Sequence, residues 1–95
     1  MTVELSSALR QALGSLVSSL ANEGFRPIAA EESASFGNFY VTFSNGERSF
    51  GVARDRGQFI VTGAERAALA AAGVWRTFSG AQQLTPLLVK WARES

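Results

Sequence analysis

The chain has 95 residues, of which 46% are hydrophobic and 18% are charged, so we expect one globular domain spanning 1–95 rather than a disordered chain. Nine basic and eight acidic residues leave a net charge of +1, which argues against a strong field that would attract nucleic acid or an anionic membrane. Cysteine and histidine are both absent, which excludes disulfides, thiol chemistry and the commonest general base and metal ligand.

The sequence predicts neither a transmembrane helix nor a signal peptide. No apolar run approaches the ~20 residues that a transmembrane helix needs. The first residues lack a basic stretch followed by a long apolar segment, so we expect no signal peptide and a cytoplasmic protein.

The first predicted element is an amphipathic helix over 3–22. Gly14 lies inside it at a cost of up to ~1 kcal/mol relative to alanine, and we interpret this glycine as a point of close packing against a sheet. Gly24 suits the left-handed position that follows a helix end. The apolar residues recur at spacings of three and four and therefore share one face, which we expect to be core: Leu5, Leu9, Leu13, Leu16, Val17 and Leu20.

An extended segment is predicted to follow from Phe25. Pro27 restricts it to an edge strand or an irregular entry to the sheet, because proline cannot donate a ladder hydrogen bond. We interpret Glu31, Glu32 and Ser33 as a polar link. The two carboxylates would point to opposite faces of an extended chain, which argues against a metal or acid–base pair.

The stretch 36–63 predicts three antiparallel strands joined by two turns that contain glycine. Asn45–Gly46 is a strong hairpin signal, because both central residues of a type I′ turn need positive φ. As a two-residue loop it pairs Val41 with Phe50. The alternation of apolar and polar residues then places one face of the sheet against the helices.

The second turn allows two registers. With Arg56–Gly57 as a two-residue loop, Val52 pairs with Val61 and Arg54 pairs with Phe59. A three-residue loop over 55–57 would shift the register by one and move Phe59 and Val61 to the opposite face. We prefer the first pairing because it predicts one coherent apolar face, made of Phe39, Val41, Phe43, Phe50, Val52, Phe59 and Val61.

The C-terminal third is predicted to be mostly helical. Alanine-rich 64–73 indicates a short helix ending at Gly73, or a loop with a helical turn. In 74–78, Val74 and either Trp75 or Phe78 should pack at one end of the sheet. The last helix has a capping-box pattern over 79–82. Pro86 either kinks this helix or marks its start, with Thr85 as the N-cap. Its apolar residues recur at helical spacing: Leu84, Leu87, Leu88 and Trp91.

Together these elements predict an α+β domain. An antiparallel sheet of three or four strands should carry the N- and C-terminal helices on one face. The opposite face would then be open to a solvent layer, a second copy of the chain or a partner protein. Its predicted residues have little charge: Tyr40, Thr42, Ser49, Gly51, Ala53, Ile60 and Thr62.

Catalysis has weak support in these residues. No nucleophile elbow, phosphate-binding loop or metal-binding motif occurs, so we expect no catalytic residues, no metal and no cofactor. Asp55 between Arg54 and Arg56 would be held ionised and would be a poor general acid. A pocket joining Tyr40, an acid and an arginine would reopen the enzyme hypothesis.

Protein recognition is the preferred function class. We select Arg54, Asp55 and Arg56, at the rim of the open face, together with Tyr40 as partner-binding residues, because arginine and tyrosine anchor many interfaces. The alternative for the turn is structural, with the stem of Arg54 covering a phenylalanine and Asp55 capping the turn. Two alternatives for the whole chain are a nucleic-acid-binding domain, with aromatic residues stacking on bases, and a homodimeric structural domain.

One resemblance bears on the partner. The string Phe36-Gly37-Asn38, two strands and then Arg54-Asp55-Arg56-Gly57-Gln58 resembles a family of small bacterial proteins with an FGN…RDRGQ core over about 25–63. Those proteins resemble immunity proteins that accompany secreted antibacterial toxins. The resemblance implies a non-catalytic protein that binds and occludes a cognate toxin. Immunity proteins against basic nucleases are often strongly acidic, so the near-neutral charge favours another toxin type.

Overall fold

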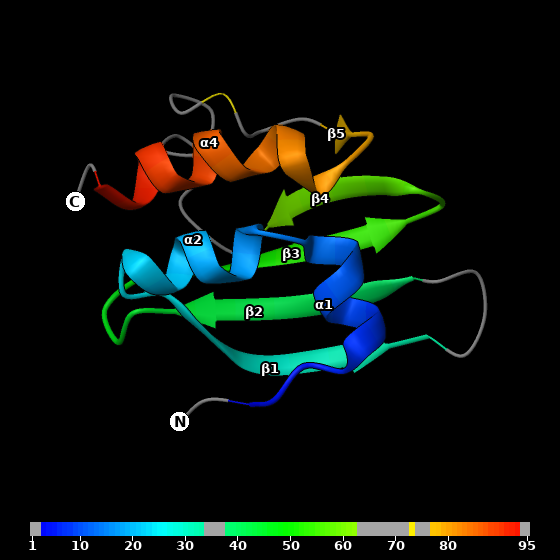
Figure 1. The fold of residues 1–95 in the computed structure, drawn as a ribbon, viewed down its shortest axis with the longest axis horizontal. Coiled ribbons are helices and arrows are strands. Elements are labelled where there is room, and N and C mark those ends of the chain that lie inside the picture. The colour runs from blue at the N-terminus through cyan, green and yellow to red at the C-terminus, as the bar shows by residue number, and fades with distance from the viewer. Residues whose placement is uncertain (1–2, 34–37, 63–72, 74–76, 94–95) are drawn as a thin grey trace.

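The computed structural model describes residues 3–33, 38–62, 73 and 77–93 (Figure 1). In these residues, five strands form one antiparallel sheet in the order β1-β2-β3-β4-β5, so the sheet is an unbroken meander. The predicted α+β class is confirmed, with five strands rather than three or four. The elements are α1 (Ser7–Leu13), α2 (Leu16–Asn22), β1 (Arg26–Glu32), β2 (Phe39–Ser44), β3 (Ser49–Asp55), β4 (Gln58–Thr62), β5 (Thr77–Phe78) and α4 (Ala81–Arg93).

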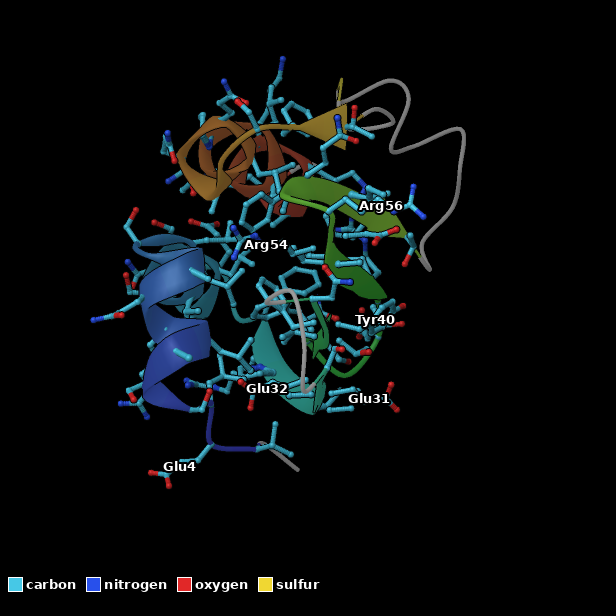
Figure 2. The ribbon with its side chains drawn as sticks, turned by 90° about the vertical axis from the view of Figure 1, so that its right-hand side faces the viewer. Glu4, Glu31, Glu32, Tyr40, Arg54 and Arg56 are labelled. Atoms are coloured by element: carbon cyan, nitrogen blue, oxygen red, sulfur yellow. The ribbon has the colours of Figure 1, made fainter. Side chains whose placement is uncertain are left out.

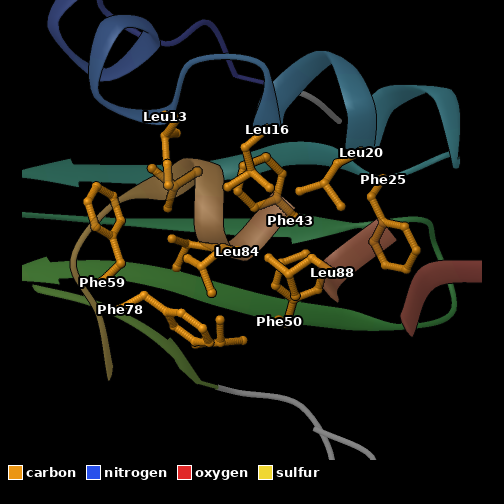
Figure 3. Packing of buried hydrophobic residues seen from close by; sticks show 14 of the residues in the cluster. Leu13, Leu16, Leu20, Phe25, Phe43, Phe50, Phe59, Phe78, Leu84 and Leu88 are labelled. Carbon is orange, nitrogen blue, oxygen red and sulfur yellow. The ribbon is translucent and has the colours of Figure 1, made fainter. Parts of the chain in front are cut away.

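Among the described residues, the helices all lie on one face of the sheet and none lies on the other, which we call the open face (Figures 1 and 2). Leucines of α1, α2 and α4 pack in one hydrophobic cluster with the inward side chains of the strands (Figure 3). The predicted apolar face is confirmed, because each of its members is buried: Phe39, Val41, Phe43, Phe50, Val52, Phe59 and Val61. None of the helices in the described residues is long and apolar enough to span a membrane.

The N-terminal helical region is two helices, so the prediction of one helix over 3–22 is wrong. Gly14 ends α1 with φ +57° and ψ −133°, a backbone conformation that residues other than glycine rarely adopt. A Cβ atom at this position would meet nothing within 4 Å, so close packing against the sheet is not the reason for the glycine. The leucines of both helices are buried. Figure 1 shows that α1 and α2 run in different directions over the same face of the sheet.

The end of α2 has the predicted left-handed glycine. Gly24 has φ +86°, its N–H donates to the Ala21 carbonyl, and the N–H of Phe25 donates to the Leu20 carbonyl at 2.9 Å. This pair of bonds is a Schellman motif, which usually carries an apolar contact beside it. Leu20 and Phe25 are both fully buried, so the turn also delivers the chain into β1.

Strand β1 is the edge strand that Pro27 predicted. Its register against β2 shifts between Pro27 and Ala29, which indicates a bulge at Ile28. The polar link expected at 31–33 is corrected, because Glu31 and Glu32 belong to β1 and pair with Tyr40 and Phe39. The two carboxylates do lie on opposite faces, since Ser6 on the helix side donates to Glu32 at 3.0 Å.

The first hairpin has a longer loop than its Asn45–Gly46 signal predicts. Ser44 pairs with Ser49 and Val41 pairs with Val52, two residues away from the predicted register. The reason is the Asn45 side chain, whose Oδ1 accepts from the N–H groups of Glu47 and Arg48 and closes the loop around itself. A shift of two residues preserves the faces of both strands, so the core residues are unaffected.

The second hairpin has the preferred register. Val52 pairs with Val61, Arg54 pairs with Phe59, and Asp55 pairs with Gln58, which leaves Arg56–Gly57 as a two-residue loop. Arg56 has φ +54° and Gly57 has φ +80°, the two positive values that a type I′ turn requires.

The C-terminal elements close the core. Phe78 of β5 is buried and pairs with Phe59, while the predictions on 64–72 and on Val74 and Trp75 lie outside the described residues. Helix α4 runs through Pro86 rather than starting there. Its capping contact comes from Gln83, whose Oε1 accepts from the N–H and hydroxyl groups of Ser79, and not from Gln82.

Candidate protein-binding surface on the open face of the sheet

Tyr40 lies across the middle of the open face. Its hydroxyl is 3.0 Å from the Thr62 hydroxyl on β4, so the side chain reaches from β2 over β3. The residue beneath is Gly51, where a Cβ atom would overlap the phenol ring and hydroxyl of Tyr40. Gly51 is buried and Tyr40 is 37% exposed, so one side of the ring covers the glycine and the other faces solvent.

The face around Tyr40 is weakly charged. Paired residues form a row across four strands, Glu31–Tyr40–Ala53–Ile60, with Thr77 of β5 at its end. The neighbouring row contains Ala29, Thr42, Gly51 and Thr62. The predicted open-face residues therefore do share one surface, and the sheet contributes an almost neutral centre with Glu31 and Asp55 towards its margins.

Two shallow hollows lie beside Tyr40 on the β1 side. One has a volume of about 260 Å³ and is lined by Ala29, Ala30, Glu31, Tyr40 and Thr42. The other has a volume of about 290 Å³ and is lined by Glu31, Glu32, Ser33, Asn38, Phe39 and Tyr40. Glu31 and Tyr40 line both hollows, so these two side chains stand on the ridge between them.

Arg54 does not lie at the rim of the open face, and this part of the prediction is corrected. It lies two residues after Val52 in β3 and therefore shares the helix side of the sheet with it. Its guanidinium carbon lies 5.9 Å from the centre of the Phe59 ring. Figure 2 shows Arg54 directed between the helices, away from Tyr40. The contact with Phe59 matches the structural alternative for this residue.

Arg54 also lines a recess on the helix side. The recess has a volume of about 110 Å³ between α1 and the strand ends, with Leu9, Glu32 and Asn38 among its walls. The Nε atom of Arg54 is buried and has no hydrogen-bond partner in the described part of the chain. Tyr40, an acid and Arg54 are therefore not joined in one pocket, because the sheet separates the tyrosine from the arginine.

Asp55 and Arg56 remain at the end of the β3–β4 hairpin, and both are exposed. The backbone N–H of Arg56 donates to Oδ1 of Asn38 at 3.1 Å, which ties the turn to the residue that precedes β2. In the described ranges, Asp55 makes no hydrogen bond that would cap the turn. In the described part of the chain, the guanidinium of Arg56 makes no hydrogen bond or ion pair, so it is exposed on a turn that its backbone N–H ties to Asn38.

The local sequence pattern does not reveal two neighbours of Tyr40, the glycine beneath its ring and the acidic residue beside it on β1. That pattern predicts Gly51 on the open face without a role and Glu31 in a polar link. The signal for the first was a glycine inside a strand, which often marks a close approach by another group. The signal for the second was the spacing of β1, which the bulge at Ile28 obscures because it shifts the alternation by one residue.

The described residues contain no group of three or more acidic residues that could hold a metal ion. Asn38 and 54–58 are the described parts of the FGN…RDRGQ string, and the bond from Arg56 to Asn38 gives their combination a structural reason. In comparisons with known proteins, no family model matches the chain, and neither a curated protein nor a solved structure matches it.

Proposed function

We propose that this chain is a protein-recognition module that binds a partner protein through the open face of its sheet. The observation that carries the proposal is the fixed position of Tyr40 in the centre of that face. A tyrosine that is already ordered provides contact area at little entropic cost when a partner arrives. Apart from Glu31, its neighbours on the face are small or uncharged, so a partner would desolvate few charges there.

The partner that we propose is a cognate bacterial toxin, which the chain would occlude without catalysing a reaction. The support for this step is the resemblance of the FGN…RDRGQ string to immunity-type proteins. Asp55 and Arg56 extend the surface, since both are exposed on the hairpin turn. Arg54 is left out of the contact because it packs over Phe59 on the helix side.

The test uses the protein encoded next to this chain, co-expressed and captured on the tagged domain. Ala53→Arg would place a long cation between Tyr40 and Ile60, so we expect at least about a 100-fold loss of affinity, as for a charge forced into an interface centre. Gln11→Arg is the matched control, because it adds the same side chain at an exposed position of α1 on the other side of the molecule.

Arg56→Asn extends this test to the turn. Asparagine tolerates positive φ, so the hairpin is retained while the charge is removed. We expect about a tenfold loss of affinity with an unchanged unfolding midpoint, as for an exposed arginine at an interface rim. Equal loss of binding in Ala53→Arg and Gln11→Arg would contradict the proposed face. In cells that express the toxin, the protection given by each variant should decrease in the same order as its affinity for the toxin.

A further inference from the structure

The exposed side of the Tyr40 ring is a preformed platform. The hydroxyl is held by Thr62 and the inner side of the ring rests on Gly51, so the ring cannot collapse further onto the sheet. Its outer side faces solvent, and the two hollows that Tyr40 lines lie on its β1 side. An aromatic face carries negative electrostatic potential, which attracts a cation placed above it.

Glu31 supplies a carboxylate next to this platform. It pairs directly with Tyr40 across β1 and β2, and it lines both hollows that the tyrosine lines. Glu31 is exposed and, within the described residues, its side chain makes no hydrogen bond or ion pair. By contrast, Glu32 on the other face accepts a hydrogen bond from Ser6.

A planar cation fits this combination better than a spherical one. A guanidinium group can stack on an aromatic ring and still direct two parallel N–H groups at a carboxylate in the ring's margin. A lysine ammonium lacks this planar fork, and an apolar side chain would leave Glu31 without a partner. The small side chains of Ala29 and Thr42 leave room for the arginine stem along the hollow of about 260 Å³.

From this geometry we infer that the open face receives an arginine side chain from the partner protein, stacked on Tyr40 and paired with Glu31. The inference rests on the proposed function and specifies the chemistry of the contact. The partner segment therefore presents an arginine at the centre of its interface, with small or apolar neighbours that suit Ala53 and Ile60.

The site can be probed without the partner by titrating the labelled domain with N-acetyl-arginine amide at constant ionic strength. We expect saturable amide shifts confined to Ala29, Glu31, Tyr40 and Thr42, with binding in the millimolar range and about tenfold weaker for N-acetyl-citrulline amide, which lacks the charge. Glu31→Gln should weaken binding of the arginine amide about fivefold, whereas the control Glu47→Gln, at an exposed loop position, should not change it. Equal binding of citrulline amide, or equal effects of the two substitutions, would overturn the inference.

Capture of the partner protein by the Ala53→Arg and Glu31→Gln variants shows whether the arginine contact or the proposed function is wrong. If Ala53→Arg abolishes capture and Glu31→Gln leaves it unchanged, the arginine contact is wrong and the protein-binding face stands. If arginine amide binds as expected but Ala53→Arg leaves capture unchanged, the proposed function of the face is wrong, and the captured protein is not the source of the arginine that the site binds. Dimerisation of the purified domain that is lost in Glu31→Gln would identify a second copy as the source of the arginine and would overturn a contact with a different protein.

Discussion

Tyr40 shows how one side chain can be both a structural and an exposed residue. It covers Gly51, bonds to Thr62 and still exposes 37% of its surface. Glycine in a strand interior weakens the strand, and a cross-strand aromatic ring compensates by packing over the gap. The pair Tyr40 and Gly51 is therefore a unit, and a substitution at either position alters the other.

A double-mutant cycle on Tyr40 and Gly51 tests this unit. Gly51→Ala should cost about 1 kcal/mol of unfolding free energy, because the new methyl displaces the ring and breaks its bond to Thr62. In a Tyr40→Ala background the same change should be neutral or stabilising, since the obstacle is gone and alanine suits a strand better than glycine. Urea unfolding monitored by tryptophan fluorescence measures both values. An equal cost in the two backgrounds would show that the ring does not rest on the glycine.

At the scale of elements, the break between α1 and α2 is a backbone feature. Each helix has only seven residues, so neither would be stable alone, and packing of the leucine face must hold them in place. Ser6 caps α1 by accepting from the N–H of Leu9 at 3.2 Å, and its hydroxyl donates to Glu32 of β1. The cap of the first helix is thus also a link to the edge strand.

Gly14→Ala distinguishes the broken helix from a continuous one by the sign of its effect. In a continuous helix, alanine would raise the unfolding free energy by up to about 1 kcal/mol. At φ +57° and ψ −133° it should instead lower it by about 1–2 kcal/mol, because the conformation is open only to glycine. Gln11→Ala, at an exposed position inside α1, is the control and should change stability by less than about 0.5 kcal/mol. A stabilising Gly14→Ala in chemical denaturation would contradict the observed break.

At the scale of the whole molecule, Arg48 joins the first hairpin to the C-terminal helix. Its guanidinium carbon lies 3.8 Å from the centre of the Trp91 ring, and the group donates to the Trp91 carbonyl at 3.2 Å. A cation at the C-terminus of a helix also interacts favourably with the exposed carbonyls. Residues more than 40 positions apart thus meet, and Phe25 and Phe50 pack against the same tryptophan.

Arg48→Met should lower the unfolding free energy by about 2 kcal/mol, since it removes a stacked cation and a helix cap but retains apolar volume. Arg93→Ala is a matched control at the same end of the molecule. Its ion pair with Glu23 at 3.1 Å is 68% exposed on the arginine side, so its loss should cost less than about 1 kcal/mol. Thermal unfolding by circular dichroism compares the two, and equal midpoints would show that Arg48 does not stabilise the fold.

Local sequence determined the α+β class, the apolar face of the central strands and the β3–β4 turn. These features depend on period-two alternation and on positive φ at Arg56 and Gly57, which are properties of neighbouring residues. The β2–β3 loop could not be predicted from Asn45–Gly46 alone, because the Asn45 side chain competes for the same backbone donors.

Only the tertiary structure decided that Tyr40 and Glu31 are neighbours on the open face. The bulge at Ile28 sets the face on which Glu31 lies, whereas Arg54 lies on the helix side because it shares a strand face with Val52 and pairs with Phe59. The position of Glu31 depends on the pairing of β1 with β2, which the local pattern does not encode because the bulge shifts the alternation. The predicted partner-binding residues are therefore divided between two faces, with Tyr40 on the open side and Arg54 on the helix side.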